Sequence, residues 1–507
     1  MTRCMLVILD GFGINTESEL DDAVKQANHP TFHELFNQPH AKLWTHGRLV
    51  GLPEGQTGGS EVGHLTLGAG RVCPQTLVRV DDLFAGNIEK HAEYIALLEY
   101  ARTHNNRLHI VMIFSDGGIH AHTAHLKSLL KILPPDIDIQ LHIASDGRDV
   151  APQSLPEYLK LFEAEIQSGR IHISSLFGRY FWFDRTNNWD RVERAYKAMT
   201  QIDRDDCPQS SEIFEILKKR YESGTMDEHQ EPIAFADGKP VADGDALWCL
   251  NFRADRGRMI SQAFVEDDFS WFIRTKLDIF YLATFRYYPE YQSHFLLDEI
   301  DIRDTLPEVI SKAKKSQLHI SETDKFIHVT KFFAGLRSEP FEGQTNKWFD
   351  SYTGGPFSEK PEMEADAICD YLIANAEQYD FTVVNFPNWD LVGHCGNLEA
   401  CKKAVSKLGD VVGRLIEYSK TYDVTLIITA DHGNCERMGT LESPDTAHTQ
   451  YAVPCWIIQG WNCLEPHIME SDLTAIAPTI LDIMWIEKPD IMTWKSLLKA
   501  QSINQKA

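Results

Sequence analysis

The sequence lacks a long apolar run and has no pair of closely spaced cysteines. The stretch MTRCMLVILDGFG contains only six consecutive apolar residues before Asp10, too few for a secretory signal or a membrane span and typical of a buried strand. Ten cysteines are scattered along the chain and no C-x-x-C pair occurs among them, a distribution typical of reduced thiols. We therefore expect a soluble globular protein of the cytoplasm.

Positive charge is also scarce. Lys and Arg number 49 against 74 Asp and Glu, which gives a formal net charge of −25. Such a surface repels nucleic acids and anionic membranes, so neither is expected as a partner. An anionic substrate must then be met by a local cluster of positive groups or by metal ions. With 507 residues, 43% of them apolar, the chain is long enough for two to four domains.

The glycine-rich stretch QTGGSEVGHLTLGAG, residues 56–70, lacks the signatures of nucleotide-binding loops. Gly58 and Gly63 have the G-x-x-x-x-G spacing, but His64 follows where a P-loop needs lysine. No G-x-G-x-x-G occurs in the stretch. Ser60 stands among the glycines, where the backbone can approach a ligand closely. Taken alone, Ser60 is more simply explained as the cap of the helix that EVGHLTL would begin.

Short β-rich runs alternate with amphipathic helical stretches along the chain. The expected strands cover residues 4–9, 107–114, 138–144, 170–176, 246–252, 278–285, 326–333, 381–386 and 424–429. Clear helical patterns lie at 154–166 and 398–419. Near-continuous apolar strands that alternate with helices are typical of parallel sheets covered on both faces. We therefore expect an α/β protein whose ligands gather beyond the carboxyl ends of the strands.

One set of polar residues lies next to expected strands near the two ends of the chain. Its members are acids and imidazoles, without a thiolate: Asp10, Asp390, His394, Asp431, His432 and His448. Asp390 and His394 are four residues apart, so one helical turn would point both the same way. Three carboxylates and three imidazoles, with the Ser60 hydroxyl, suit two divalent ions of the Mn²⁺ or Zn²⁺ kind.

A second set lies in the middle of the chain and is rich in arginine. It follows expected strands and consists of His120, Arg148, Asp149, Arg179, Arg185, Arg253 and Arg256. Because arginine forks bind phosphate or carboxylate through two hydrogen bonds, this part of the chain is expected to bind anions.

Each of these residues also has a simpler explanation when it is considered alone. An aspartate at a strand end is more often a turn or helix-cap residue than a metal ligand. Arg253 and Arg256 could make weak surface ion pairs at the start of a helix. Complementary chemistry at several strand ends of one chain favours the functional alternative.

The motifs that carry these residues resemble those of a known family. LDGFG, GGSEVGHLTLGAGR, TADHGN and the D-x-x-x-H of NWDLVGH are similar to metal-site motifs of the alkaline phosphatase superfamily. SDGGIHAH, SDGRDV, GRYFWFDR, NFRADR, ETDKFIHVT and FFAGLRSEPFEGQ resemble motifs of the cofactor-independent phosphoglycerate mutases. Because the motifs occur in order from residue 10 to 448, the resemblance covers nearly the whole chain.

The resemblance implies two divalent metal ions of the Mn²⁺ type and no requirement for 2,3-bisphosphoglycerate. It assigns the ligands in two groups: Asp390, His394 and His448 for one ion, and Asp10, Ser60, Asp431 and His432 for the other. Ser60 matches the nucleophile of the family, which takes up the phosphoryl group and becomes phosphoserine. A serine hydroxyl is a weak nucleophile at neutral pH unless it is activated, for which a divalent ion is well suited.

The resemblance also assigns residues to the substrate, which would be 2- or 3-phosphoglycerate. The matching positions are His120, Arg148, Asp149, Arg179, Arg185, Arg253, Arg256 and Lys325. Asp149 resembles the residue that shuttles protons with the glycerate hydroxyls. Lys325 and the metal ions would neutralise the charge of the transferred group. The implied reaction interconverts 3-phosphoglycerate and 2-phosphoglycerate in glycolysis and gluconeogenesis.

The family's architecture is a discontinuous domain with an insertion. It implies a phosphatase-like metal-binding domain over residues 1–76 and 303–507, and an inserted phosphotransferase domain over residues 77–302. We expect the protein to act as a monomer on its small-molecule substrate. Two alternatives stay open: a phosphatase with the same metal site and water as acceptor, and a non-catalytic relative that binds phosphorylated metabolites.

The sequence departs from the family pattern at three places. Trp389 stands where proline is usual, and Cys395 replaces the usual threonine after His394. Phe181-Trp182-Phe183 is bulkier than the usual Tyr-Ala-Met. None of these departures removes an expected ligand or arginine, so they concern the fit of the site and not the class of reaction.

Overall fold

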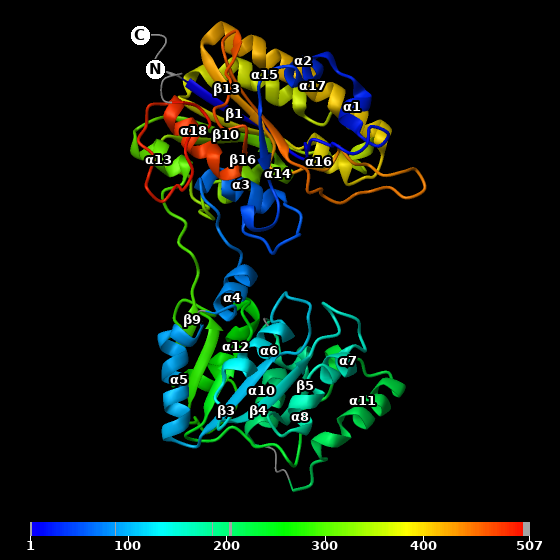
Figure 1. The fold of residues 1–507 in the computed structure, drawn as a ribbon, viewed down its shortest axis with the longest axis vertical. Helices are drawn as coiled ribbons and strands as arrows, with labels where there is room; N and C mark the ends of the chain where they lie inside the picture. The colour runs from blue at the N-terminus through cyan, green and yellow to red at the C-terminus, as the bar shows by residue number, and fades with distance from the viewer. Residues whose placement is uncertain (1–2, 87, 185, 202–204, 500–507) are drawn as a thin grey trace. The chain divides into compact units, whose positions relative to one another are not determined.

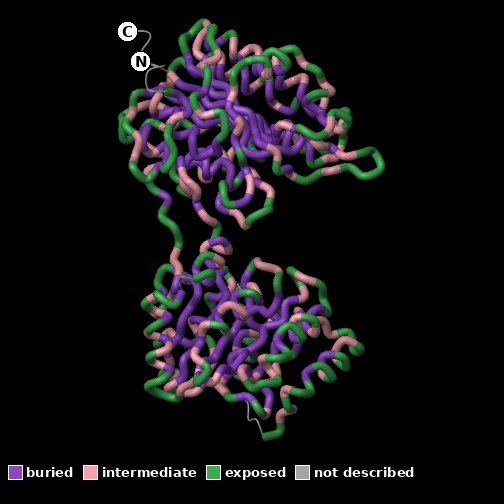
Figure 2. The backbone as a smooth tube through the Cα atoms, in the orientation of Figure 1, coloured by how far each residue is buried: buried purple, intermediate pink, exposed green. Residues whose placement is uncertain are grey.

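Two β-sheets organise the chain, and each has a buried core of its own (Figures 1 and 2). The computed structural model describes residues 3–86, 88–184, 186–201 and 205–499. Unit 1 comprises two chain segments, Met1–Gln75 and Asp301–Ala507, and unit 2 comprises Thr76–Ile300. Unit 1 is therefore discontinuous in sequence, and unit 2 is inserted into it.

The sheet of unit 1 is mainly parallel and has the strand order β11-β10-β12-β1-β13-β14-β2-β16, with β15 paired to β14. Its strands are β1 (Arg3–Leu9), β2 (Ala41–Trp44), β10 (Gln317–Glu322), β11 (Gln344–Phe349), β12 (Phe381–Phe386), β13 (Val424–Thr429), β14 (Val453–Gln459), β15 (Asn462–Cys463) and β16 (Glu470–Asp472). The central strand β1 runs parallel to both neighbours, with Cys4 opposite Phe381 and Thr425. Every residue of β1 after Arg3 is buried, as its apolar sequence predicts.

Helices cover both faces of this sheet (Figure 1). They are α1 (Ala23–Ala27), α2 (Pro30–Phe36), α3 (Ser60–Ala69), α13 (Leu306–Lys312), α14 (Thr323–Ile327), α15 (Ala365–Asn375), α16 (Asn388–Gly393), α17 (Leu398–Tyr422) and α18 (Ile476–Ile483). The long helix α17 begins where the Asn397 side chain accepts a hydrogen bond from the Ala400 amide, and it ends at Asp423 in a left-handed conformation. The expected helix at 398–419 is thus present.

The sheet of unit 2 is built in the same way, with the order β6-β5-β4-β3-β7-β8-β9. Its strands are β3 (Arg107–Ile113), β4 (Asp138–Ser145), β5 (His172–Gly178), β6 (Ile233–Ala234), β7 (Ala246–Cys249), β8 (Phe280–Phe285) and β9 (His294–Leu297). All neighbouring pairs are parallel except β5 and β6. The helices are α4 (Thr76–Phe84), α5 (Ala92–Thr103), α6 (Thr123–Ile132), α7 (Leu155–Lys160), α8 (Glu163–Gln167), α9 (Arg179–Trp182), α10 (Trp189–Thr200), α11 (Ile213–Glu222) and α12 (Ala254–Val265).

The expected strand at 326–333 is wrong. The segment contains the end of α14 and a π-helical turn at His328–Phe332. Its buried apolar residues Val329 and Phe333 are four positions apart, a helical spacing, whereas Ile327 is exposed. The strand of this region, β10, ends earlier, at Glu322. The β-branched and aromatic residues of 326–333 suggested a strand, but they lie in helical turns.

The helical pattern at 154–166 forms two short helices, α7 and α8, instead of one. The strands β2, β6, β9, β15 and β16 were not expected, because a run of two to four residues carries little periodic signal. The longer strands β10, β11 and β14 were not expected either. In the part of the chain that the structure describes, no helix has both the length and the apolar composition that a membrane span needs.

Close packing of α3 depends on the absence of a side chain at Gly68. A Cβ atom there would overlap the backbone carbonyl of Phe333. We expect Gly68→Ala to lower the free energy of unfolding by at least about 2 kcal/mol, because a backbone group cannot move aside as a flexible side chain can. Gly413→Ala is the matched control on α17, where the nearest atom is the Thr31 hydroxyl at 3.3 Å. There, alanine should stabilise the protein by about 0.5–1 kcal/mol, as urea unfolding would measure; equal effects at both positions would contradict this account.

Candidate active site

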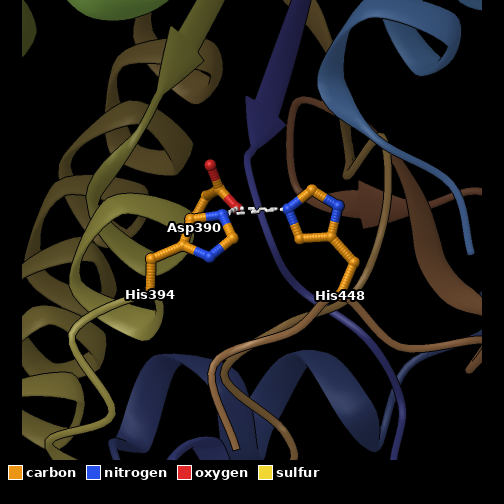
Figure 3. A group of neighbouring side chains, drawn as sticks. All are labelled: Asp390, His394 and His448. Atoms are coloured by element: carbon orange, nitrogen blue, oxygen red, sulfur yellow. Dashed lines mark hydrogen bonds and ion pairs between the residues drawn. The ribbon is translucent and has the colours of Figure 1, made fainter. Parts of the chain in front are cut away.

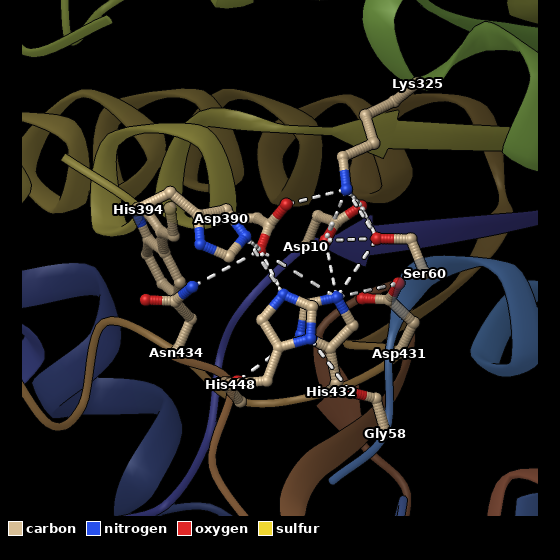
Figure 4. Close-up of polar contacts among 12 residues, drawn as sticks. Asp10, Gly58, Ser60, Lys325, Asp390, His394, Asp431, His432, Asn434 and His448 are labelled. Atoms are coloured by element: carbon tan, nitrogen blue, oxygen red, sulfur yellow. Dashed lines mark hydrogen bonds and ion pairs between the residues drawn. The ribbon is translucent and has the colours of Figure 1, made fainter. Parts of the chain in front are cut away.

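Four neighbouring parallel strands of unit 1 end at one edge of its sheet and carry the charged residues of Figure 4. Asp10 follows β1 directly, and Asp431 and His432 follow β13. Asp390 lies on α16 after β12, and Lys325 lies on α14 after β10. The carboxyl ends of parallel strands meet at the same edge, so residues distant in sequence become neighbours there.

Asp390, His394 and His448 form one group of potential metal ligands (Figure 3). Asp390 and His394 lie one helical turn apart, and His448 comes from the loop before β14. The Nε2 atoms of His394 and His448 lie 3.1 and 3.0 Å from Asp390 Oδ1. The two Nε2 atoms are 3.0 Å apart. Three protein ligands that converge in this way leave room for a further ligand, as catalytic metal sites require.

Backbone carbonyls fix the orientation of both imidazoles in this group. His394 Nδ1 lies 2.7 Å from the Thr446 carbonyl oxygen, and His448 Nδ1 lies 2.8 Å from the Gly58 carbonyl oxygen. A carbonyl oxygen only accepts hydrogen bonds, so each Nδ1 carries the proton. In the neutral rings, the Nε2 lone pairs then point toward Asp390, which is the arrangement found around metal ions bound by histidine.

Ser60 lies at the centre of a second group. Its Oγ atom is 3.3 Å from Asp10 Oδ1 and 3.0 Å from His432 Nε2, and it also contacts Lys325 Nζ. Ser60 is the first residue of α3; Gly59 is the N-cap, and no side chain caps this helix end. The simpler explanation of Ser60 as a helix cap is therefore wrong.

Asp431 completes this group from the side of α3. Its Oδ2 atom lies 3.6 Å from His432 Nε2 and 3.2 Å from His64 Nδ1, but neither carboxylate oxygen accepts a hydrogen bond from the described residues. Gly63 allows this approach, since a Cβ there would come within 2.8 Å of the Asp431 backbone carbonyl. A fully buried carboxylate without hydrogen-bond donors calls for a cation, so the donor set fits a bound metal ion.

Buried negative charge dominates the electrostatics of these two groups. Asp10, Asp390 and Asp431 are all buried, and Lys325 Nζ lies 2.7 Å from Asp390 Oδ2 and 3.3 Å from Asp10 Oδ2. Burial opposes ionisation of the aspartates, but the Lys325 charge and the neighbouring histidines together outweigh it and hold the pKa values of Asp10 and Asp390 below their usual range. Burial likewise opposes the charge of Lys325, and the surrounding carboxylates outweigh it and raise its pKa. Three carboxylates and one ammonium group leave a net charge of about −2, which one divalent ion would balance; a second ion would make the site positive.

Three residues of this region were not predicted from the sequence. Asn385 Nδ2 donates to Asp10 Oδ2 at 2.7 Å, and Asn434 Nδ2 donates to Asp390 Oδ1 at 3.3 Å. His64 Nδ1 donates to the Ser60 carbonyl oxygen at 2.9 Å. An amide inside the apolar run FTVVNF was the available signal for Asn385, since a polar side chain in a buried strand needs a partner.

A second cluster lies within unit 2, again at the carboxyl ends of adjacent parallel strands. Arg179 Nη1 donates to Asp146 Oδ1 at 2.5 Å and to Asp149 Oδ2 at 2.6 Å. Arg179 Nη2 lies 2.9 Å from His120 Nε2. Asp146 was not among the expected residues, although it stands in the motif SDGRDV; its Oδ1 also accepts the backbone amides of Arg148 and Asp149. Asp146 therefore fixes both the loop and the guanidinium.

His120 is a neutral imidazole in this cluster. Burial lowers its pKa most, and the Arg179 charge lowers it further, to about 4. The ring of Phe183 packs beside it, with ring centroids 4.9 Å apart. A neutral ring next to a fixed guanidinium can accept or donate a hydrogen bond without adding charge.

The other expected residues of unit 2 have different settings. Arg148 pairs with Glu228 at 3.3 Å. Arg253 and Arg256 both pair with Asp255, at 3.0 and 3.7 Å, as the surface ion-pair alternative for these two residues anticipated. Arg256 donates from Nη1 to the Phe183 carbonyl oxygen at 2.7 Å. Arg185 lies outside the described residues.

The departures from the family pattern have simple structural settings. Trp389 is fully buried, with its ring 4.3 Å from that of Phe12 in an edge-to-face arrangement, so it fills the core behind Asp390. The Cys395 thiol donates to the Leu391 carbonyl oxygen at 3.5 Å. Phe183 offers its ring to His120 and its carbonyl group to Arg256, and so helps to shape the unit 2 cluster.

Comparisons with known proteins agree with this geometry. A family model described as the Metalloenzyme superfamily matches residues 2–488. A 2,3-bisphosphoglycerate-independent phosphoglycerate mutase from Moorella thermoacetica is 38% identical over 506 residues, which cover 97% of this chain and 98% of the relative. A protein of the same name from Flavobacterium johnsoniae is 37% identical over 509 residues, covering 98% and 99%. The chain belongs to this mutase family.

A solved structure extends the likeness to three dimensions. The crystal structure of Leishmania mexicana phosphoglycerate mutase at low cobalt concentration aligns with a TM-score of 0.58 and 29% sequence identity, and the alignment covers 98% of each chain. The expected family and the α/β class with mainly parallel sheets are thereby confirmed. Membership of a metalloenzyme superfamily, with the ligand groups described above, supports dependence on divalent metal ions.

Metal binding should release protons at neutral pH. Burial opposes protonation of His432, but Asp431, Asp10 and Asp390 outweigh it and raise its pKa to about 10 in the metal-free protein. This bound proton stabilises the folded metal-free protein fully below the unfolded pKa of about 6.5, and the contribution is lost as the pH rises through about 10. Since a metal ion needs the neutral ring, binding at pH 7.5 must expel the proton.

We therefore expect titration of the metal-free protein with Mn²⁺ at pH 7.5 to release about one proton or more, and the affinity to rise between pH 7 and 9. Calorimetry in two buffers of different ionisation enthalpy measures the release. His104→Gln, at an exposed histidine of unit 2, is the control and should leave the release unchanged. A buffer-independent binding enthalpy for the unmodified protein would contradict the assignment of His432 as a ligand.

Proposed function

We propose that this chain is an isomerase that interconverts 3-phosphoglycerate and 2-phosphoglycerate without 2,3-bisphosphoglycerate as a cofactor, in glycolysis and gluconeogenesis. The observation that carries the proposal is the position of the Ser60 hydroxyl. It contacts Asp10, His432 and Lys325 in a chain that belongs to the family of enzymes named for this reaction. A serine that only capped a helix or only filled the core would not need to contact buried charged groups.

Ser60 is the proposed nucleophile. Its Oγ forms a bond to the phosphorus atom of 3-phosphoglycerate while the bond from phosphorus to the glycerate oxygen breaks, which leaves phosphoserine and glycerate. Lys325 lies close to Ser60 Oγ and to Asp390, so its charge can offset the negative charge of the transferred phosphoryl group. In the second half, the other glycerate hydroxyl attacks the phosphoserine and regenerates Ser60.

The metal ions are assigned to two ligand groups. Asp390, His394 and His448 would hold one, and Asp10, Ser60, Asp431 and His432 the other. Divalent ions held there would make the Ser60 hydroxyl easier to deprotonate and would offset the charge of the phosphoryl oxygens. Oxygen and imidazole donors without a thiolate suit Mn²⁺ or Zn²⁺, and we assign Mn²⁺ because the family resemblance implies it. The backbone carbonyls that orient His394 and His448 support the first assignment, and the unpartnered carboxylate of Asp431 supports the second.

The unit 2 cluster is the proposed binding site for the glycerate part of the substrate. The residues assigned to it are His120, Arg148, Asp149, Arg179, Arg185, Arg253 and Arg256. Asp149 would move the proton between the two glycerate hydroxyls. Its Oδ2 atom is held by Arg179 at 2.6 Å and lies 3.3 Å from His120 Nε2, so the carboxylate is fixed in position.

The remaining features of the proposal follow from the composition of the chain. The small-molecule substrate is its partner, and the negative net charge of −25 disfavours nucleic acid and membrane surfaces. We place the enzyme in the cytoplasm and regard it as a monomer. In this scheme unit 1 is the phosphatase-like metal-binding domain and unit 2 the phosphotransferase domain.

Replacing the nucleophile should abolish turnover. Ser60→Ala removes the atom that accepts the phosphoryl group, so we expect at least about a 10⁴-fold loss in kcat while circular dichroism and the unfolding midpoint stay close to those of the unmodified protein. Ser419→Ala on α17 is a matched control, because its hydroxyl is buried and donates only to the Ile416 carbonyl oxygen at 2.8 Å. A folded Ser60→Ala protein with near-normal isomerisation would refute the phosphoserine proposal.

A mutase and a phosphatase differ in what happens to glycerate. With 3-phosphoglycerate labelled in its carbon chain and an excess of unlabelled glycerate, we expect the 2-phosphoglycerate formed to keep the label. Arg256→Ala should slow isomerisation and raise the share of turnovers that end in inorganic phosphate, because it weakens the grip on glycerate while water can attack the phosphoserine. Arg414→Ala, at a surface ion pair of α17, is the control. Extensive transfer of phosphate to the unlabelled glycerate by the unmodified enzyme would contradict retention.

A further inference from the structure

Glu436 is a buried carboxylate that lies outside the proposed ligand groups. It is 0% exposed and follows His432 by four residues. Its Oε2 atom accepts the backbone amides of Gly13 at 3.0 Å and Asn434 at 2.8 Å. Its Oε1 atom accepts the hydroxyl of Thr449. Both oxygens are therefore used. Gly13 lies in the loop after β1, whereas Asn434 and Thr449 lie in two separate segments of the long connection between β13 and β14.

Each of these three segments carries a proposed metal ligand. Gly13 follows Asp10 by three residues, Asn434 follows His432 by two, and Thr449 is next to His448. The three segments also contact one another directly through β-bridges between Gly11 and Gly433 and between Gly433 and Thr449. One side chain is thus hydrogen-bonded to all three segments.

The loops leave room for this carboxylate by having no side chain in its place. A Cβ atom on Gly13 or on Gly433 would overlap Glu436 Oε1. The backbone carbonyl of Glu436 is used as well, since it accepts the Asn15 side chain at 2.7 Å. An apolar residue at position 436 would leave two buried backbone amides without hydrogen-bond acceptors, which costs free energy of folding. Packing alone therefore does not explain why a carboxylate stands here.

We propose that Glu436 is a positioning residue that holds the loops of Asp10, His432 and His448 at the spacing that the metal ions require. It does not touch substrate or metal; it acts through the loop backbone. This inference rests on the proposed function in one respect, namely that these three residues are metal ligands. Residues behind the ligands commonly change metal affinity by about 10–100-fold.

Three substitutions separate hydrogen-bond geometry from charge. Glu436→Ala removes all three bonds, Glu436→Asp keeps the charge but draws it away from the amides, and Glu436→Gln keeps the shape. We expect the Mn²⁺ dissociation constant, measured by calorimetry or by the electron paramagnetic resonance of free Mn²⁺, to rise about 10–100-fold for alanine and aspartate. Glutamine should stay within about threefold of the unmodified protein, because one amide oxygen still accepts from both backbone donors.

The pattern of kinetic constants provides a second readout. At saturating Mn²⁺ the alanine variant should recover the kcat and the substrate KM of the unmodified enzyme, because only the ligand spacing was affected. Asp472→Ala is the matched control for the alanine variant, since Asp472 is a buried carboxylate of unit 1 that accepts hydrogen bonds from Thr474. It should lower the unfolding midpoint and leave the Mn²⁺ affinity unchanged.

The outcomes are distinct. A Glu436→Ala protein that binds Mn²⁺ as tightly as the unmodified one overturns this inference alone, and so does a glutamine variant that is as weak as alanine. Unmodified protein that binds no Mn²⁺ overturns the proposed function and this inference with it. If the alanine variant does not fold, Thr449→Val and Thr449→Ser decide, because valine removes the bond to Glu436 and serine keeps it. Equal Mn²⁺ affinity of these two variants would overturn the inference.

Discussion

Repulsion among three buried carboxylates is the constraint on which the rest of this site depends. Asp10, Asp390 and Asp431 converge at the carboxyl ends of β1, β12 and β13, and burial makes their charges expensive. The Lys325 charge offsets part of this negative charge. In the metal-free protein, the proton on His432 offsets a further part. The site is therefore a cation site by its own charge balance, before any ligand is considered.

Such a concentration of charge needs a rigid frame. The parallel strands supply it because the same hydrogen-bond ladder that aligns β10, β12, β1 and β13 also aligns the residues that follow them. Glycine at position 63 lets α3 pack close to Asp431, and this packing brings Ser60, the first residue of α3, next to the charged groups. Backbone carbonyls and amides then orient the side chains of the site through hydrogen bonds.

Unit 2 uses the same architecture for a cluster of mixed charge. This cluster also lies beyond adjacent parallel strands, and it combines one guanidinium and two carboxylates with His120, which is kept neutral. Asp146 and Asp149 fix the Arg179 guanidinium from both sides. In a protein with a net charge of −25, a buried guanidinium held in this way is a fixed positive group.

The sequence by itself determined the family, the α/β class and the strand ends at which polar residues gather. These are local properties: apolar runs mark buried strands, and motifs such as TADHGN or NWDLVGH keep their spacing along the chain. The helical turn that joins Asp390 and His394 could likewise be predicted from their separation by four residues. Local patterns were misleading at 326–333, where β-branched residues suggested a strand although the buried positions have a helical spacing.

Only the tertiary structure decided which residues stand behind the ligands. Asn385 and Asn434 hold the side chains of Asp10 and Asp390, which are distant in sequence, so no local pattern could reveal these pairs. His64 lies one helical turn after Ser60, but its approach to Asp431 joins two elements that are far apart in the chain. It also decided that Ser60 does not cap its helix, because a helix boundary one residue earlier makes Gly59 the cap. Contacts of this kind depend on strand order and loop packing, which a single sequence does not encode in its local spacing.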